Sequence, residues 1–550
     1  MRVRGAGAGA VALIALLVWL VAYPLLLTLI EGLRSDGAWT LEHVRAFAAR
    51  PTELQALWGS LWISIASVIL AALIGVPLAL LFSRYDFPGS RLFGTIVALP
   101  AVLPPLVGVI AFLFLYGESG FLAHLVRRVF GLDETPWRFQ GASAILLVHA
   151  YSMYVYFYLF TRAGLAALDA SVYEAAASLG AGRWRTFTRV VVPLLRPHLA
   201  GAAMLTFMTS LASFSAPYIF GGGFRVMTTQ IVATRLNGDD GLAMVETVSL
   251  TIVALIGLWL LRRTDAEEVV GGSKGAAPRP VPVTSPTMRS LLAVISALLA
   301  VVLLLPHLTL LLVSFVPLGT WTTEALPPAY STGNYLTLLR DPVRARPLAN
   351  SLWMASAATA AALVIAIAAG ALTVRRRTRG ARAIETLIAL PWAVPGTVFA
   401  IALAAAFSVD SPATLRLILV GTIWILPLAY LIRNLPITGR AVVAGFRRLD
   451  PSLDEAAASL GAGKGRTLRR VTIPLLRPAL LAGGTLAFVT AFGDFVTSIM
   501  LYTYDTRPVS LEILSSLRQS DVGVAAAYGV VLMLVSATVF ALGAERGSGG

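Results

Sequence analysis

Apolar stretches of about 20 residues recur along the whole chain, and that length is enough to cross the hydrocarbon core of a bilayer as one helix. Only 13% of the residues are charged, which is about half of what a water-soluble surface requires. The sequence therefore predicts an all-α membrane protein that crosses the bilayer many times. Bounded by charge or by Pro/Gly clusters, the apolar stretches predict about twelve transmembrane helices, at residues 9–31, 58–83, 93–116, 142–163, 198–220, 243–262, 289–315, 350–374, 384–408, 413–434, 479–501 and 522–542.

The first apolar run follows Arg2 and Arg4, as in a secretory signal. It is too long for the apolar core of a signal peptide, so we expect it to remain as the first helix.

The distribution of basic residues predicts the orientation of the chain. The net charge is +15, but the basic residues lie between apolar spans, so we expect a membrane-lipid environment and no nucleic-acid partner. With the N-terminus in the cytoplasm, the basic clusters at 375–382, 447–448 and 469–470 fall in cytoplasmic connections, as the positive-inside rule requires. Both termini are then expected to be cytoplasmic.

The residue types needed for catalysis or metal binding are scarce. The chain has no cysteine and five scattered histidines, and no His/Cys/Asp/Glu group has catalytic or metal-ligand spacing. We expect no enzymatic site, no resident metal and no cofactor.

A segment of the first half of the chain is repeated in the second half. Residues 173–197, YEAAASLGAGRWRTFTRVVVPLLRP, recur at 454–478 as DEAAASLGAGKGRTLRRVTIPLLRP. Such self-similarity indicates a tandem duplication. Further matches pair Ser60-Leu61-Trp62 with Ser351-Leu352-Trp353, the Leu99 to Pro104 stretch with Leu390 to Pro395, and Phe207 and Phe214 with Phe488 and Phe495.

The duplication predicts the domain organisation. Each copy has six predicted spans, an even number, so both enter the membrane in the same orientation around an axis along the membrane normal. We expect a first half at 1–263 and a second half at 289–550, joined by a cytoplasmic Gly/Pro/Ser-rich linker at 264–288. The repeated loops, at 164–197 and 435–478, then both face the cytoplasm.

Each repeated loop is predicted to contain a short helix. Ser171 and Glu174 in one copy, and Ser452 and Glu455 in the other, have the S-x-x-E spacing of a capping box. The helix is expected to end at Gly180 or Gly461, because glycine adopts the left-handed conformation at little cost. A short helix with small alanines outside the membrane suits a groove on another protein. The alternative is a passive connector whose glutamates are only caps, but two near-identical copies weaken it.

The E-A-A segment, the following glycine and the apolar-Pro end resemble the EAA loop of binding-protein-dependent importer permeases, and the resemblance covers nearly the whole chain. It implies the type I permease fold of ATP-binding-cassette (ABC) importers in a bacterial inner membrane, with two copies of a cytoplasmic ABC ATPase and a periplasmic solute-binding protein as partners. The leucine that usually precedes the closing proline is replaced by Val192 and Ile473. The resemblance implies a coupling role, in which the loop docks on the ATPase, for Glu174, Ala175, Ala176 and Gly180 and for Glu455, Ala456, Ala457 and Gly461.

The segment from Gly461 to Gly465 superficially resembles a phosphate-binding loop. That motif needs Gly-Lys-Ser/Thr with an earlier glycine, but Gly465 follows Lys464 and Ala458 stands at the position of the first glycine. We therefore expect ATP hydrolysis in a separate subunit.

Several residues are candidates for the solute path between the halves. Acidic residues at membrane depth are functional by default, and Asp494 lies in the eleventh span, with Ser213 at the repeated position. The alternative is that Asp494 is solvated or capped near the outer end. Phe214 and Phe495 are candidate gates, although such aromatics more often only pack. Prolines at 100, 104, 105, 391 and 395 should kink or break the third and ninth spans.

The cargo is the least determined property, because the binding protein largely sets selectivity in such importers. The fused architecture and the segment FGDFVTSIMLYTYDTRPVSLEI are most similar to ferric-iron permeases; thiamine, polyamine and phosphonate remain alternatives. A secondary transporter of the major-facilitator type is the alternative from a different class, and the paired EAA loops argue against it.

Overall fold

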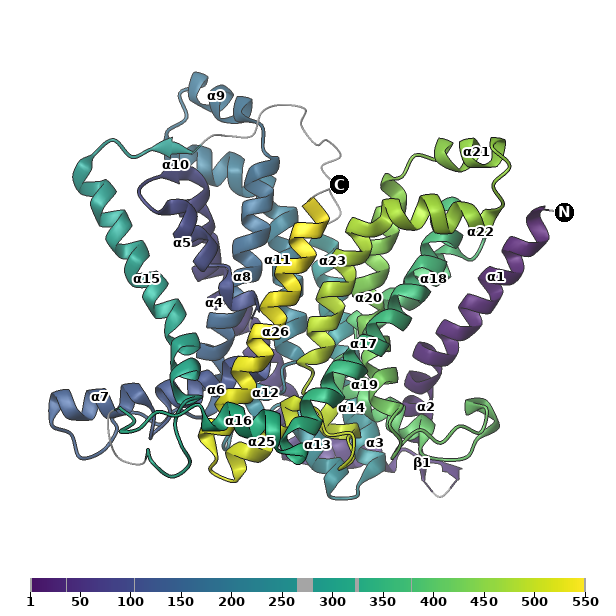
Figure 1. Cartoon of the computed structure of the whole chain (residues 1–550), viewed down its shortest axis with the longest axis horizontal. Helices are drawn as coiled ribbons and strands as arrows, with labels where there is room; N and C mark the ends of the chain where they lie inside the picture. The colour runs from purple at the N-terminus through teal and green to yellow at the C-terminus, as the bar shows by residue number, and fades with distance from the viewer. Residues whose placement is uncertain are drawn as a thin grey trace.

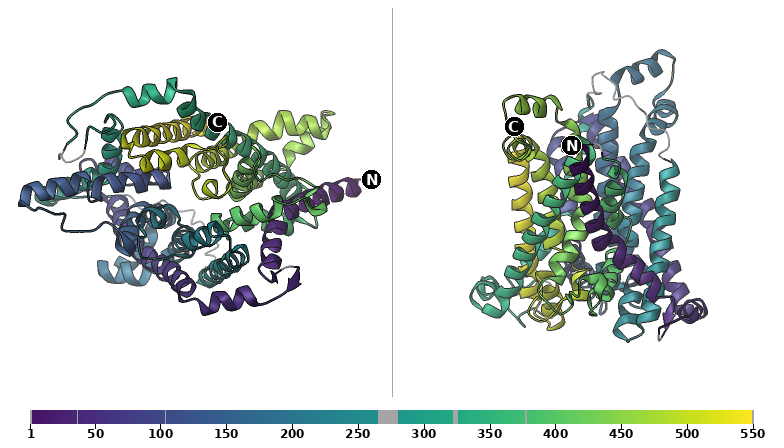
Figure 2. Two further views of the ribbon diagram at one scale, coloured as in Figure 1. Left: turned by 90° about the horizontal axis from the view of Figure 1, so that it is seen from below. Right: turned by 90° about the vertical axis from the view of Figure 1, so that its right-hand side faces the viewer.

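The computed structural model describes residues 2–35, 37–102, 104–264, 280–321, 326–376 and 378–548. Within them the chain is almost entirely helical, and the long helices run side by side (Figures 1 and 2). Ten helices are long and apolar enough to cross a membrane, and a bent pair makes an eleventh span in this described part. The all-α fold with two tandem copies is confirmed.

The first half begins with α1 and ends with α14. Its elements are α1 (Arg2–Leu17), η1 (Val18–Ala22), α2 (Tyr23–Glu31), β1 (Arg34–Ser35), β2 (Ala38–Trp39), α3 (Glu42–Ala49), α4 (Pro51–Arg84), β3 (Tyr85–Asp86), α5 (Ser90–Ile96), η2 (Leu99–Val102), α6 (Pro105–Tyr116), α7 (Phe121–Phe130), α8 (Gly141–Ala167), α9 (Ala170–Ser178), α10 (Arg183–Thr186), η3 (Phe187–Val191), α11 (Val192–Leu211), α12 (Ser215–Phe220), α13 (Met227–Leu236) and α14 (Asp240–Thr264).

The second half repeats much of this order. Its elements are β4 (Val281–Pro282), α15 (Pro286–Val313), α16 (Gly333–Arg340), α17 (Pro342–Gly370), η4 (Ala371–Arg375), α18 (Ala381–Ala389), η5 (Leu390–Trp392), α19 (Gly396–Phe407), η6 (Pro412–Thr414), α20 (Ile425–Arg448), α21 (Ser452–Ser459), α22 (Lys464–Thr467), η7 (Leu468–Thr472), α23 (Ile473–Phe492), α24 (Ser498–Leu501), α25 (Val509–Arg518) and α26 (Val522–Ser548).

The strands are two residues long and join neighbouring segments. β1 pairs antiparallel with β2, and β3 pairs in parallel with β4. The predicted linker at 264–288 falls mostly outside the described residues, and its described end contains β4.

Proline breaks the third and ninth predicted spans, as expected. Pro100 lies in the short turn η2, and α6 starts only at Pro105. In the other copy, α18 with η5 meets α19 at an angle of 108°, between Pro391 and Pro395. Proline has no N–H to donate and its ring clashes with the preceding turn, so both spans become two short helices.

The predicted tenth span, 413–434, was wrong in position. Residues 415–424 are irregular, with Leu415, Arg416 and Gly421 at positive φ. The helix is α20, which starts at Ile425 and runs to Arg448 beside α17 and α23. It contains Arg433 and Asn434, whose polar groups bond within the protein, so hydropathy does not identify it. With α20 as a further crossing, the fold is consistent with about twelve spans.

Close packing defines the centre of each half. In the first half α4 packs on α8, and a Cβ on Gly75 would lie 2.4 Å from the Tyr154 carbonyl oxygen, so only glycine permits this approach. The largest buried cluster includes residues of both halves, among them Phe214 and Phe495. The two halves therefore share one core.

Candidate coupling loops and solute path

The two repeated loops form helices of nearly identical build. α9 and α21 project from the same end of the molecule, on opposite sides of it (Figure 1). The predicted left-handed glycines are confirmed, since Gly180 has φ +72° and Gly461 has φ +77°. The last turns close in the same way: Ala181 N–H donates to the Ala176 carbonyl at 3.0 Å, and Ala462 N–H to that of Ala457 at 2.9 Å.

The helix starts differ from the sequence prediction. In place of a Ser/Glu capping box, the Asp169 carboxylate accepts from Ser171 N–H at 2.9 Å, and the Asp450 carboxylate accepts from Ser452 N–H at 2.9 Å. The bonds from Ser452 lower the pKa of Asp450 from its ordinary value. The prediction placed the cap two residues too late because Asp-x-Ser and Ser-x-x-Glu overlap in this sequence.

Each of the two loop helices, α9 and α21, presents a defined outer face. Glu174, Ala175 and Gly180 are exposed and Ala176 is buried; Glu455, Ala456, Gly461 and Ala457 repeat this pattern. Sequence reasoning missed the side chains that protrude most: Leu179 is 87% exposed and Leu460 is 89% exposed. The signal for them was their identical place before the repeated glycine.

An arginine connects each of the two loop helices to the end of a membrane span. The Arg84 guanidinium, at the end of α4, lies 5.4 Å from the centre of the Tyr173 ring. At the matching place in the second half, Arg375 Nε lies 3.5 Å from the Asp454 carboxylate. Each of these helices is therefore in contact with the end of a long helix, α4 in the first half and η4 after α17 in the second.

A cavity of about 320 Å³ lies between the halves, lined by segments of both. Ser213 and Phe214 lie on its wall. Arg433 is the one charged residue that the described part of the chain places there. The other polar side chains of the wall carry hydroxyl, indole or imidazole groups. They are Tyr151, Ser152, Tyr156, Thr209, Ser215, Trp392, Thr490 and His149.

Asp494 contacts this cavity through Arg433. Its carboxylate forms a close ion pair with the Arg433 guanidinium and accepts from the N–H groups of Thr497 at 2.9 Å and Ser498 at 3.1 Å. The side chain of Asp494 is almost fully buried, whereas that of Arg433 is partly exposed. The carboxylate of Asp494 is therefore satisfied by Arg433 and two backbone N–H groups and is not solvated; its role in the solute path stays a prediction. Sequence reasoning missed Arg433, which stood at the end of a misplaced span.

Ser213 occupies the matching position in the first half, and its hydroxyl contacts a buried histidine, His149. His149 Nε2 lies 2.9 Å from Ser213 Oγ, and its Nδ1 lies 2.9 Å from Ser67 Oγ and 3.2 Å from Ser210 Oγ. His149 and Ser213 line the cavity, whereas Ser67 lies on α4 behind them. His149 is a single polar residue in an apolar run, and sequence reasoning assigned it no role.

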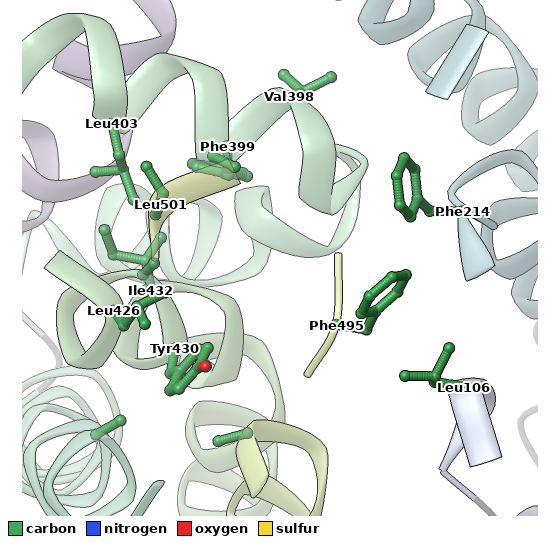
Figure 3. Close-up of a cluster of buried hydrophobic side chains, with 14 of the residues drawn as sticks. Leu106, Phe214, Val398, Phe399, Leu403, Leu426, Tyr430, Ile432, Phe495 and Leu501 are labelled. Atoms are coloured by element: carbon green, nitrogen blue, oxygen red, sulfur yellow. The ribbon is translucent and has the colours of Figure 1, made fainter. Parts of the chain in front are cut away.

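Phe214 and Phe495 meet between the halves. Their ring centres are 5.6 Å apart, both are buried, and Tyr218 packs against both rings. Figure 3 shows the two rings near each other on separate segments, with Leu106 and Val398 on either side. α12, which follows Phe214, lies toward the end of the molecule opposite α9 and α21 (Figure 1). The aromatic contact thus joins the two halves on that side of the molecule.

Comparison with known proteins gives one family and relatives that align over most or part of this chain. The family model described as "Binding-protein-dependent transport system inner membrane component" matches residues 68–266 and 361–544. A probable ABC transporter permease of Sinorhizobium fredii is 28% identical over 94% of this chain and 91% of its own length. A ferric transport system permease of Actinobacillus pleuropneumoniae is 27% identical over 95% of this chain and 75% of its own length. A thiamine transport system permease of Brucella abortus is 29% identical over 40% of this chain and 41% of its own length.

Proposed function

The chain belongs to the family of binding-protein-dependent transport system inner membrane components and is the permease of an ABC importer, and we propose that it carries ferric iron from a periplasmic binding protein to the cytoplasm. The family assignment excludes the alternative of a secondary transporter of the major-facilitator type. The ferric cargo is supported by the relative of that name, which aligns over 95% of this chain, whereas the thiamine relative aligns over 40%.

The lining of the cavity favours a cargo that is not a bare cation. A cationic solute such as thiamine or a polyamine would meet the Arg433 guanidinium without a carboxylate on the same wall, because Asp494 lies behind the arginine. Like charges in a space of low dielectric repel strongly. Ferric iron is a hard cation that binds oxygen ligands. Oxyanion ligands that mask the charge of the iron would accept hydrogen bonds from Arg433 and from the hydroxyl groups of the wall.

The observation that carries the proposed mechanism is the pair of matching helices at one end of the molecule. α9 and α21 each expose a glutamate and a leucine in the same arrangement. An exposed leucine beside small residues suits an apolar pocket on a partner. Two such sites account for two ATPase subunits, one at each helix, on the cytoplasmic side together with both termini.

The proposed cycle is a shift between two populations of the permease. Closure of an ATP-bound ATPase dimer would draw α9 and α21 together. Arg84 and Arg375 would pass this motion to α4 and α17. Separation of Phe214 from Phe495 would then open the cavity toward the binding protein. In the described conformation the two rings are in contact, which would correspond to a closed outer side in this cycle.

Uptake in reconstituted vesicles tests the proposal. The vesicles hold this chain, its ATPase and its binding protein, with ferric iron or thiamine as cargo and Glu174→Ala/Glu455→Ala as the variant. We expect ATP-dependent iron uptake that the double variant lowers about tenfold or more, because both docking helices lose a contact. Glu42→Ala, an exposed glutamate at the start of α3, serves as the control. Uptake of thiamine alone would contradict the cargo, and unchanged uptake in the double variant would contradict the coupling role.

A further inference from the structure

Two buried glutamates meet at the outer end of the first half, away from the coupling loops and the cavity. Glu53 lies in the first turn of α4 and is 2% exposed; Glu246 lies in α14 and is 0% exposed. Each carboxyl is within hydrogen-bonding reach of the other. The start of α4, α13 and α14 lie at the end opposite α9 and α21 (Figure 1).

Hydrogen bonds join the two carboxyls on one side only. Gln230 Nε2 donates to Glu53 Oε1 at 3.1 Å and to Thr234 Oγ1 at 3.5 Å. Thr234 Oγ1 in turn donates to Glu246 Oε1 at 2.7 Å. Both N–H groups of Gln230 Nε2 and the hydroxyl of Thr234 therefore already donate, and none is left for the other carboxyl oxygens.

The second oxygen of each carboxyl lacks a hydrogen-bond donor. Glu53 Oε2 and Glu246 Oε2 are both buried, and within the described part of the chain neither has a hydrogen-bond partner. Two acceptors cannot bond each other, and two ionised carboxylates in contact repel strongly in a buried site. One proton between the two oxygens would remove the repulsion and supply the missing donor.

The second half has different residues at the corresponding site. Ser60 Oγ accepts from Met227 N–H at 2.7 Å, and Ser351 Oγ accepts from Val509 N–H at 2.9 Å, so these contacts align the two copies. Counted from them, four positions of the second half correspond to Glu53, Gln230, Thr234 and Glu246, namely Arg344, Glu512, Ser516 and Tyr528.

In that copy the site is neutralised by fixed charges. Arg344 lies 3.6 Å from Glu512 and 3.4 Å from Asp521, and Arg507 lies 3.0 Å from Glu512. Arginine stays charged at any pH that proteins tolerate. The first half has glutamate where the second has Arg344, so it lacks this internal counter-charge.

The charged groups around the glutamate pair are already engaged with one another or with Gln230. Arg50 pairs with Asp239 at 3.3 Å, and Arg235 with Asp240 at 3.1 Å. Arg225 donates to Gln230 Oε1 at 3.2 Å. His43, on α3, packs against Gly241 at the start of α14. None of these described groups donates to the two free carboxylate oxygens.

We propose that Glu53 and Glu246 form a proton-binding site that holds α4, α13 and α14 together at the outer end of the first half. The occupant is a single shared proton. Its loss leaves two adjacent carboxylates and loosens the packing of α14 on α4. Because the folded chain binds this proton where an unfolded chain has released it, stability decreases as the pH rises. The second half has no such dependence at the matching site.

The test is thermal unfolding of the full chain in detergent between about pH 6 and about pH 9, combined with infrared detection of a protonated carboxylic acid. In Glu246→Gln the amide donates to Glu53 Oε2 as the shared proton does. We expect the wild-type midpoint to fall by a few degrees as the pH rises, and the Gln variant to keep its midpoint and lose the acid band. Glu53→Gln should behave in the same way.

Glu512→Gln is the matched control from the second half. It removes a partner of Arg344 and Arg507, so its midpoint should be lower than that of the wild type at every pH while the slope with pH persists. A wild-type slope and acid band in Glu246→Gln would overturn the proposal. The proposal would also be overturned if sodium, potassium or calcium chloride raised the unfolding midpoint of the wild type at about pH 9 back to its value at about pH 6. The occupant of the site would then be a metal cation.

Discussion

In the Arg433–Asp494 pair, Asp494 is the buried partner and Arg433 is the partner on the cavity wall. The sequence alone does not distinguish these two positions. Asp494 is held by Arg433 and two backbone N–H groups, so its buried charge is compensated. Removing Arg433 would leave the carboxylate without its counter-charge, which is costly in a buried site.

We therefore predict that Arg433→Gln lowers the free energy of unfolding by about 2 kcal/mol, a figure reduced for the partial exposure of the arginine. Denaturant titration in mixed micelles measures it. The double variant Arg433→Gln/Asp494→Asn should recover most of the stability, because no charge is left unpaired. It should not recover iron uptake if Arg433 contacts the cargo. Full recovery of uptake would assign the pair a purely structural role.

Leu179 and Leu460 provide a second test at the residue scale. Both are almost fully exposed, so Leu179→Ser/Leu460→Ser should leave the unfolding midpoint unchanged. If each inserts into a pocket of an ATPase subunit, the dissociation constant of that subunit should rise about tenfold. Binding to the permease in nanodiscs measures it, and Leu339→Ser, an exposed leucine on α16, is the control. An equal affinity in the leucine variant would exclude these side chains from the interface.

At the scale of helices, the start of α21 depends on an ionised side chain. Asp450 accepts from Ser452 N–H, and this bond lowers its pKa. A carboxyl whose pKa is lower in the folded state stabilises that state above its unfolded pKa, and the contribution is lost as the pH falls through the folded pKa. The cap should therefore be complete at neutral pH and fail only below about pH 4.

Hydrogen exchange of residues 452–459 checks this cap. We predict that Asp450→Ala reduces their protection several-fold at neutral pH, because an N–H group at the helix start loses its acceptor. Asp450→Asn should retain most of the protection, since asparagine is also a good N-cap. Equal protection in wild type and Asp450→Ala would show that the cap does not hold the helix.

Most helices could be predicted from apolar length, and the duplication could be read from the repeated loop. α20 could not, because its apolar residues alternate with Arg433, Asn434 and Arg440. Hydropathy cannot recognise that Asn434 Nδ2 donates to the Ala487 carbonyl at 3.0 Å. The partners of Asp494 and Ser213 were missed for the same reason: tertiary packing brings Arg433 and His149 to them from other helices. The left-handed glycines were predictable because they depend on local conformation alone.

At the scale of the whole molecule, the two halves share a core but differ in their polar groups. Phe214 and Phe495 pair across the halves, whereas Ser213 contacts histidine and Asp494 contacts arginine. The two halves thus share a packed framework, and the polar groups beside the cavity differ between them.

The contact of Phe214 with Phe495 can be trapped, because the chain has no cysteine of its own. We predict that a flexible bismaleimide reagent cross-links Phe214→Cys/Phe495→Cys in the absence of nucleotide, since the ring centres of the two native side chains are 5.6 Å apart. ATP with the ATPase and the loaded binding protein should reduce the yield, because the halves separate there. A yield independent of ATP would contradict a gate at this position.

The distance between α9 and α21 tests the central claim most directly. Spin labels on Ser178→Cys and Ser459→Cys, both exposed at the ends of these helices, report it by pulsed electron resonance in nanodiscs that contain the ATPase. We predict that ATP, under conditions that prevent hydrolysis, shortens this distance and that Glu174→Ala/Glu455→Ala abolishes the change. An unchanged distance in the wild-type loops, with ATP bound and the ATPase attached, would contradict coupling through the two helices.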